Sequence, residues 1–152
     1  TNPFWTGTDT NDPNGGTPFY SASGFGIDVH TGDWEAWFGG WRAASETQTF
    51  SQSVEIVAGG PRFINYWRNV VAAPDGTATL KIYVDSTVVS TKDVTAWSSE
   101  LTTWVNESVD ITAQAGGTHT VKFEYTFSGV DDGNLFIDDV TIDDHAGSTR
   151  RR

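Results

Sequence analysis

The stretch HTVKFEYTF, residues 119–127, decides the fold class of this chain. Its apolar residues Val121, Phe123, Tyr125 and Phe127 alternate with polar ones, so they lie on one face of an extended strand. An amphipathic helix is excluded here, because its apolar residues recur every three or four positions. The stretch therefore predicts a half-buried β-strand.

The same kind of pattern recurs along the chain. Alternating or apolar runs occupy residues 47–57, 62–71, 78–84, 102–111 and 134–142. The run 62–71 is apolar on both parities, which predicts a central strand covered on both faces. Asp85 and Ser86 follow 78–84 and predict a hairpin turn. Short strands at regular spacing, without a long helical period, predict an all-β chain folded as an antiparallel β-sandwich of the jelly-roll type.

Length and composition limit the chain to one folded unit. The 152 residues suffice for a single core, which we expect to span 1–144, with 145–152 as a disordered basic tail. The chain has no Cys, which excludes disulfides, thiolate metal sites and a cysteine nucleophile. A net charge of −11 disfavours nucleic acid and anionic membranes as partners. No apolar run is long enough to predict membrane insertion.

Acidic residues gather before and within the last predicted strand. Within nine residues stand the oxygen-bearing side chains of Asp131, Asp132, Asn134, Asp138 and Asp139. Calcium takes six to eight oxygen ligands, and the glycine between Asp132 and Asn134 would let the chain turn tightly around an ion. The spacing does not follow the twelve-residue helix–loop–helix pattern. Two interpretations stay open, a calcium site and a set of solvated turn residues.

Strand parity gives Asp138 a special place. It shares a face with Phe136, Val140 and Ile142, which we predict to be the core face. A carboxylate on that face needs backbone donors or a bound cation. A second polar cluster around Asp9, with Asn11, Asp12 and Asn14, has no strand to anchor it and is predicted to be a flexible loop.

Tryptophan is the other candidate for function. An exposed ring stacks on the apolar face of a pyranose, whose hydroxyls then bind nearby polar side chains. Trp34 differs in parity from Trp37 and Trp41, so at least one of the three is expected to face outward. The predicted ligand platforms are Trp5, Trp34, Trp41, Trp97 and Trp104. In the alternative interpretation, most of these rings fill the core between the sheets.

The sequence offers little support for catalysis. Its histidines, His30, His119 and His145, are scattered and form no HExxH zinc motif. A GxSxG nucleophile elbow is also absent from the sequence. We predict no catalytic residue, and we expect His30 and His119 to be surface residues.

Four stretches resemble the jelly-roll domains of secreted and cell-surface bacterial proteins. They are NPFW (2–5), TGDWEAWFGG (31–40), SETQTFSQSV (45–54) and LFIDDVTI (135–142). This group is similar to the MAM domain, to the cleaved-adhesin domains and to several carbohydrate-binding modules. The resemblance covers residues 2–143, and its motifs are more specific for the architecture than for one activity.

The resemblance implies a non-catalytic accessory module, monomeric within a larger secreted or cell-surface protein of bacterial type. Such a module would recognise a glycan or a cell-surface protein, and the acid excess and missing thiols also favour secretion. Relatives hold a structural calcium, which maps onto Asp138 and Asp139. The usual opening carboxylate would lie before Asn2, so Glu46 or backbone carbonyls are expected to compensate. The alternative function is a structural spacer that stabilises an adjacent catalytic domain, such as a secreted protease.

Overall fold

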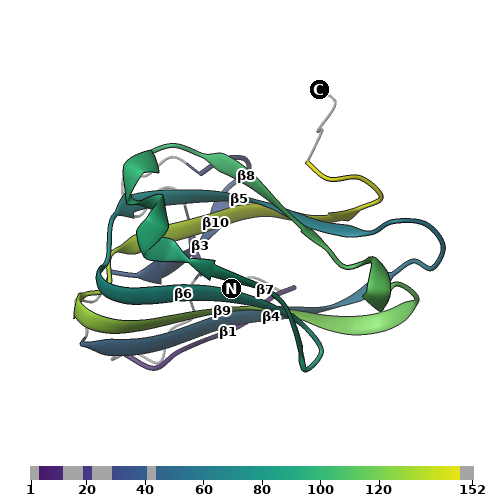
Figure 1. Cartoon of the computed structure of the whole chain (residues 1–152), viewed down its shortest axis with the longest axis horizontal. Coiled ribbons are helices and arrows are strands. Elements are labelled where there is room, and N and C mark those ends of the chain that lie inside the picture. The colour runs from purple at the N-terminus through teal and green to yellow at the C-terminus, as the bar shows by residue number, and fades with distance from the viewer. Residues whose placement is uncertain (1–3, 12–18, 22–28, 41–43, 148–152) are drawn as a thin grey trace.

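The computed structural model describes residues 4–11, 19–21, 29–40 and 44–147. In these ranges two five-stranded antiparallel sheets pack face to face, one above the other in Figure 1. The predicted all-β antiparallel sandwich is therefore confirmed. Within the described ranges, no helix has the length and apolar character that crossing a membrane requires.

The first sheet lies lower in Figure 1 and has the strand order β1-β4-β9-β6-β7. Its strands are β1 (Thr6–Asp9), β4 (Ser45–Ile56), β9 (Gly117–Asp131), β6 (Asp75–Val84) and β7 (Thr87–Asp93). The stretch 119–127 forms the middle of β9, at the centre of this sheet. The predicted hairpin turn joins β6 to β7, with Val84 opposite Thr87.

The second sheet has the order β2-β3-β10-β5-β8. Its strands are β2 (Phe19–Ser21), β3 (Trp34–Gly39), β10 (Asn134–Asp143), β5 (Phe63–Ala72) and β8 (Val105–Asp110). Two short 3-10 helices, η1 (Val94–Glu100) and η2 (Thr112–Gln114), flank β8 in sequence. As predicted from its two apolar parities, β5 is an inner strand, between β10 and β8.

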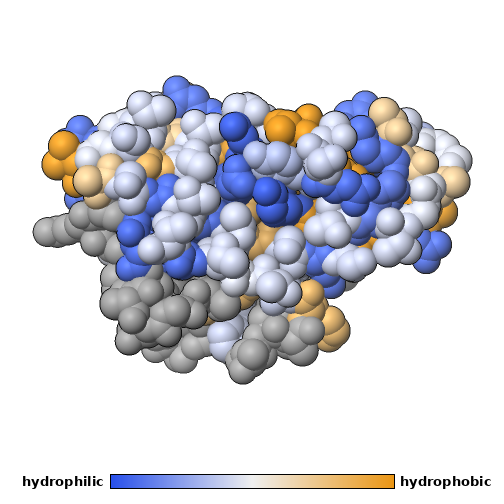
Figure 2. Space-filling view, turned by 90° about the horizontal axis from the view of Figure 1, so that it is seen from below, coloured by the Kyte–Doolittle hydropathy of each residue, from blue (hydrophilic) through white to orange (hydrophobic). Residues whose placement is uncertain are grey.

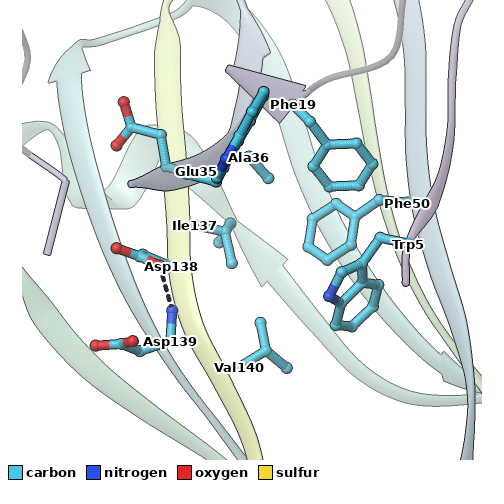
Figure 3. Close-up of a pocket in the computed structure, with 10 residues that line it drawn as sticks. Trp5, Phe19, Glu35, Ala36, Phe50, Ile137, Asp138, Asp139 and Val140 are labelled. Atoms are coloured by element: carbon cyan, nitrogen blue, oxygen red, sulfur yellow. Dashed lines mark hydrogen bonds between the residues drawn. The ribbon is translucent and has the colours of Figure 1, made fainter. Parts of the chain in front are cut away.

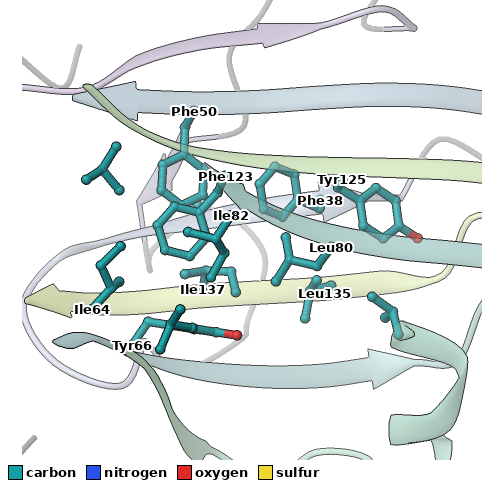
Figure 4. Packing of buried hydrophobic residues seen from close by; sticks show 14 of the residues in the cluster. Phe38, Phe50, Ile64, Tyr66, Leu80, Ile82, Phe123, Tyr125, Leu135 and Ile137 are labelled. Atoms are coloured by element: carbon teal, nitrogen blue, oxygen red, sulfur yellow. The ribbon is translucent and has the colours of Figure 1, made fainter. Parts of the chain in front are cut away.

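Aromatic rings fill the space between the sheets (Figure 4). Phe50 stacks on Phe123 of the same sheet at a centroid distance of 4.7 Å, and on Phe38 of the other sheet at 5.4 Å. Tyr66 meets Phe123 edge to face at 5.3 Å. Offset and edge-to-face pairs are the geometries that aromatic quadrupoles favour. The alternating residues predicted for β9 thus form the core.

In the last strand, β10, the core-facing positions shift by one residue halfway along the strand. Leu135 and Ile137 belong to the core, so Phe136 and Asp138 lie on the opposite face of β10, and their predicted place on the core face is wrong. The reason is a β-bulge, because the pairing of β10 with β5 shifts register between Asp138 and Thr141. Asp139 sits in this bulge with φ +48°. Beyond it, Val140 and Ile142 pack against the core as predicted.

Figure 2 shows the molecule from below, on the side of the first sheet. Viewed from this side, the surface is mostly hydrophilic (Figure 2).

The folded part of the chain extends past residue 144. Gly147 N donates to Asn65 Oδ1 (3.0 Å) and to Ser108 Oγ (2.8 Å). Residues 148–152 of the predicted tail lie outside the described residues, and their disorder stays a prediction.

Candidate functional site

The outer face of the second sheet carries two rows of side chains that run across β3, β10 and β5. Strand pairing fixes these rows, because opposed residues on adjacent strands share a face, as do residues two positions apart on one strand. We call this set the outer grid. Trp37, Phe136 and Asn69 form one row, and Asp138 and Trp67 form the next; Glu35, two residues before Trp37, shares their face just beyond the last paired residue of β3, Ala36.

The aromatic row is held by tight packing. The rings of Trp37 and Phe136 stack at a centroid distance of 5.7 Å and an angle of 17°. The indole Nε1 of Trp37 donates to Asn134 Oδ1 at 2.7 Å. Gly40 lies against this ring at φ +90°, and a Cβ at this position would overlap the indole. The predicted calcium ligand Asn134 therefore orients a tryptophan.

The two aspartates of β10 accept hydrogen bonds from the segment before β3. Thr31 N donates to Asp138 Oδ2 at 3.0 Å, and Asp139 N donates to Asp138 Oδ1 at 2.6 Å. Asp139 accepts from Thr31 Oγ1 at 2.5 Å and is hydrogen-bonded to His30 Nδ1 at 2.8 Å. Both carboxylates are thus stabilised by protein donors, which is one of the two solutions that the sequence left open for Asp138.

His30 links these acids to aromatic rings. Its imidazole stacks on Trp67 at a centroid distance of 4.0 Å and meets Trp104 edge to face at 5.5 Å. The prediction that His30 is a plain surface residue misses this role, since the imidazole is half-buried. Trp67 was also missed as a site residue, although its position on a strand covered on both faces was a usable signal.

Two members of the outer grid bury an acceptor atom without a donor. Glu35 is 5% exposed, and its Oε2 atom has no hydrogen-bond partner. Asn69 is 6% exposed, and its Oδ1 atom has none. Burial and the nearby charge of Asp138 raise the pKa of Glu35 to about 7, and burial also raises the pKa of Asp138. Two buried acceptors of this face thus lack a donor from the described residues.

An open hollow lies at the edge of this face, and we call it the edge hollow. It brings together two kinds of residue predicted from the sequence, and its lining includes Trp5, Trp34, Glu35, Asp138 and Asp139. In Figure 3 the carboxylates of the three acids gather on one side of β10, and the rings of Trp5, Phe19 and Phe50 lie on the other. The Trp34 side chain is 45% exposed. The hollow thus borders both an acidic and an aromatic surface.

A second group of carboxylates lies where β1, β4 and the β9–β10 turn meet. We call Glu46, Asp132 and Asp9 the end cluster. Glu46 is 4% exposed, and neither of its carboxylate oxygens has a hydrogen-bond partner. Burial, followed by the charges of Asp132 and Asp9, raises the pKa of Glu46 to about 9. The described residues near this carboxyl group are themselves acids, and hydrogen bonding with Asp132 and Asp9 also favours its protonated form.

The other two acids of the end cluster are fixed by hydrogen bonds. Asp132 is fully buried, and its Oδ1 accepts from Gly40 N at 3.2 Å. Asp9 Oδ2 accepts from Gln48 Nε2 at 2.6 Å. Asp9 belongs to β1, so it is not part of a flexible loop as predicted, because its strand pairs with β4. Asp12 and Asn14 of that prediction lie outside the described residues.

The predicted calcium ligands do not gather at one place. Glu46 and Asp132 belong to the end cluster, whereas Asp138 and Asp139 lie on the outer face of the second sheet. Asp131 Oδ1 accepts from Gly133 N at 3.1 Å in the turn between β9 and β10. Across the described residues, no three acidic, histidine or cysteine side chains are already arranged as a metal site.

The predicted tryptophan platforms also separate. Trp97 is 9% exposed, and the guanidinium of Arg68 lies 4.0 Å from the centroid of its ring, so it fills the core. Trp5 packs edge to face on Phe50 at 5.0 Å. Trp104 is half-buried beside His30, and Trp41 lies outside the described residues. Of the described candidates, Trp34 is the most exposed.

Comparison with known proteins defines the class of fold. No protein-family model matches this chain, and no curated protein sequence matches it. Solved structures do match, among them TmCBM61 in complex with β-1,4-galactotriose. That structure is 21% identical and has a TM-score of 0.54, and the match covers 91% of this chain and 86% of that one.

Two further solved structures are similar over most of their length. A cleaved adhesin domain of Lys-gingipain from Porphyromonas gingivalis is 16% identical with a TM-score of 0.60, covering 93% of this chain and 91% of that one. The extra C-terminal domain of an exo-1,3/1,4-β-glucanase from a Pseudoalteromonas species is 14% identical with a TM-score of 0.60, covering 92% and 84%. The chain thus has the β-sandwich fold of carbohydrate-binding modules and cleaved-adhesin domains, and the resemblance seen in its motifs is confirmed.

Proposed function

We propose that this chain is a non-catalytic module that binds a glycan at the edge hollow. The observation that carries the proposal is the exposed ring of Trp34 in one hollow with three acidic residues. A pyranose can stack its C–H face on an indole while its hydroxyls donate to carboxylates. Asp138 and Asp139 retain this capacity, because each carboxylate oxygen has more than one lone pair.

The similar structures support a binding role. One was solved with a galactotriose, and another is an extra domain of a glucanase. By analogy we place this module in a larger secreted or cell-surface protein of bacterial type, where it acts as a monomeric unit. A cell-surface protein is the second kind of partner that the fold accommodates, as in the adhesin domain.

We also propose that the end cluster binds a structural calcium ion. Glu46 carries the argument, because a buried carboxylate without any donor is stable only when protonated or bound to a cation. Glu46, Asp132 and Asp9 would hold the ion, and calcium completes its shell with backbone carbonyls and water. The ion would neutralise the carboxylates and join β1 to the β9–β10 turn.

A glycan array followed by tryptophan-fluorescence titration tests the binding role. We expect a saturable change in fluorescence with a subset of polysaccharides, and a loss of at least about tenfold in affinity in Trp34→Ala. Tyr83→Ala is the matched control, because Tyr83 is an aromatic residue on the outer face of the first sheet, beneath Lys122. Silence across the array would favour the structural spacer, a role consistent with the packed Trp5 and Trp97.

A further inference from the structure

The acidic side of the edge hollow has an excess of acceptors. Glu35, Asp138 and Asp139 all line it, and the ion pair that a described titratable cation makes with one of them is that of His30 with Asp139. The described arginines are engaged elsewhere. Arg68 is hydrogen-bonded to Glu100 and Glu107, and Arg62 donates to the carbonyl oxygens of Val57 and Pro61. The described protein thus brings no lysine or arginine to this group of acids.

Glu35 has one carboxylate oxygen, Oε2, without a hydrogen-bond partner among the described residues. Asp138, whose charge acts on Glu35, accepts two backbone hydrogen bonds. Glu35 Oε2 accepts none from the described residues, although Glu35 is 5% exposed. The second unpartnered atom of this face, Asn69 Oδ1, is also an acceptor. A neutral hydroxyl can satisfy an acceptor, but a bound positive charge also stabilises Glu35 and Asp138 when both carboxyl groups are ionised.

We infer that the glycan bound in the edge hollow carries a free, positively charged amino group, which binds between Glu35 and Asp138. This inference rests on the proposed function and names the class of ligand. An ammonium group has three donors and no acceptor, so it complements the unpartnered acceptor Glu35 Oε2 beside Asp138. Trp34 lines the same hollow but alternates in facing with Glu35, so it would contact another sugar unit of the same glycan.

The hydrogen bonding favours an ammonium over a metal ion. Each oxygen of Asp138 and Asp139 already accepts a hydrogen bond from a protein donor or pairs with His30. A compact ammonium can bind with one or two acceptors and leave those bonds intact. The exposed aromatic ring in the same hollow favours an amino sugar over the lysine of a protein partner.

The test compares oligomers of glucosamine with N-acetylated oligomers of the same length by calorimetry at pH 6.5. Acetylation removes the charge and leaves the sugar ring, so we expect the free amine to bind at least about tenfold more tightly to the wild-type protein. We expect Glu35→Gln to reduce this preference to less than threefold. Glu55→Gln is the matched control, because Glu55 is an exposed glutamate on β4, and it should retain the full preference.

Equal binding of both oligomers by the wild-type protein would overturn this inference and leave the proposed glycan binding standing. An unchanged preference in a folded Glu35→Gln variant would also overturn it. Competition by a lysine-rich peptide that is unaffected by Trp34→Ala would assign the charge recognition to a protein partner. If neither these oligomers nor any glycan of the array bind, the proposed function itself fails.

Discussion

Glu46 and Asp138 are both buried acids, and the protein surrounds them differently. Asp138 accepts hydrogen bonds from the backbone of Thr31 and of Asp139, so its carboxylate is stabilised within the chain. Glu46 receives no hydrogen bond from the described part of the chain, although it is buried at least as deeply. Burial of an acidic side chain therefore does not by itself identify a ligand site. Asp138 is stabilised by backbone hydrogen-bond donors, whereas Glu46, without such donors among the described residues, needs a proton or a bound cation.

The largest expected effect concerns the end cluster. Calcium at about 100 times its dissociation constant should stabilise the fold by about 2.7 kcal/mol, and a chelator should remove this gain. For a chain of this length the change corresponds to about 5 to 10 °C in Tm, measured by thermal unfolding. Glu46→Gln should lose the calcium response yet unfold no earlier than the wild type in chelator. A wild-type Tm that does not change with calcium would contradict the calcium proposal.

The opposite behaviour is expected for Asp138. Asp138→Asn places an amide donor against backbone N–H donors, so we expect a loss of about 2 kcal/mol in the free energy of unfolding, with or without calcium. Denaturant titration measures this loss. Asp33→Asn, at an exposed aspartate, is the control and should change stability by less than about 0.5 kcal/mol. A loss that appears only in calcium would place Asp138 at the ion instead.

Glu35 should make stability depend on pH. The pKa of Glu35 is raised from 4.5 to about 7 in the folded state. The folded state therefore holds this proton more tightly than the unfolded state does. The stability that Glu35 contributes is complete below pH 4.5 and is lost as the pH rises through about 7. In chelator we expect the free energy of unfolding to fall between pH 5 and pH 8, with a contribution from Glu35 on the order of 2 kcal/mol. The difference between wild type and Glu35→Gln isolates that contribution, because Glu46, whose pKa is also raised, is present in both. Parallel pH profiles would contradict it.

The smallest effect on stability is expected at Trp34. Because its ring is 45% exposed, Trp34→Ala should change the free energy of unfolding by less than about 1 kcal/mol while it abolishes most glycan binding. Trp97→Ala is the contrasting variant, since its ring is buried and its removal should destabilise the fold by about 3 kcal/mol or more. Equal effects of the two variants on stability would show that Trp34 is a packing residue.

Much of the fold could be predicted because its main pattern is local. In β9 the residues Val121, Phe123, Tyr125 and Phe127 point to one side because successive side chains of an extended chain alternate. The same rule failed in β10, where the bulge at Asp139 reverses the facing of Asp138 relative to Val140. A bulge shifts by one residue which side chains of the strand face the core, and it cannot be recognised from the sequence of that strand alone.

The candidate site could be predicted only in part. Asp138, Asp139, Trp5 and Trp34 were predicted and meet at one hollow. Glu35 and His30 were missed, because an isolated acid beside two tryptophans and a single histidine in a turn carry no spacing pattern. Their importance arises from strand pairing, which sets β3 beside β10, and from the hydrogen bond of His30 with Asp139.

By itself, the sequence determined the class of fold, the acidic character and the kinds of residue available for binding. These follow from composition and from alternation over a few neighbouring residues. The tertiary structure decided which acids share a site, because Glu46 meets Asp9 only when β1 pairs with β4, and Glu35 meets Asp138 only when β3 pairs with β10. Neighbouring strands are chosen by long-range packing of the whole core, so contacts between distant residues cannot be inferred from either strand alone.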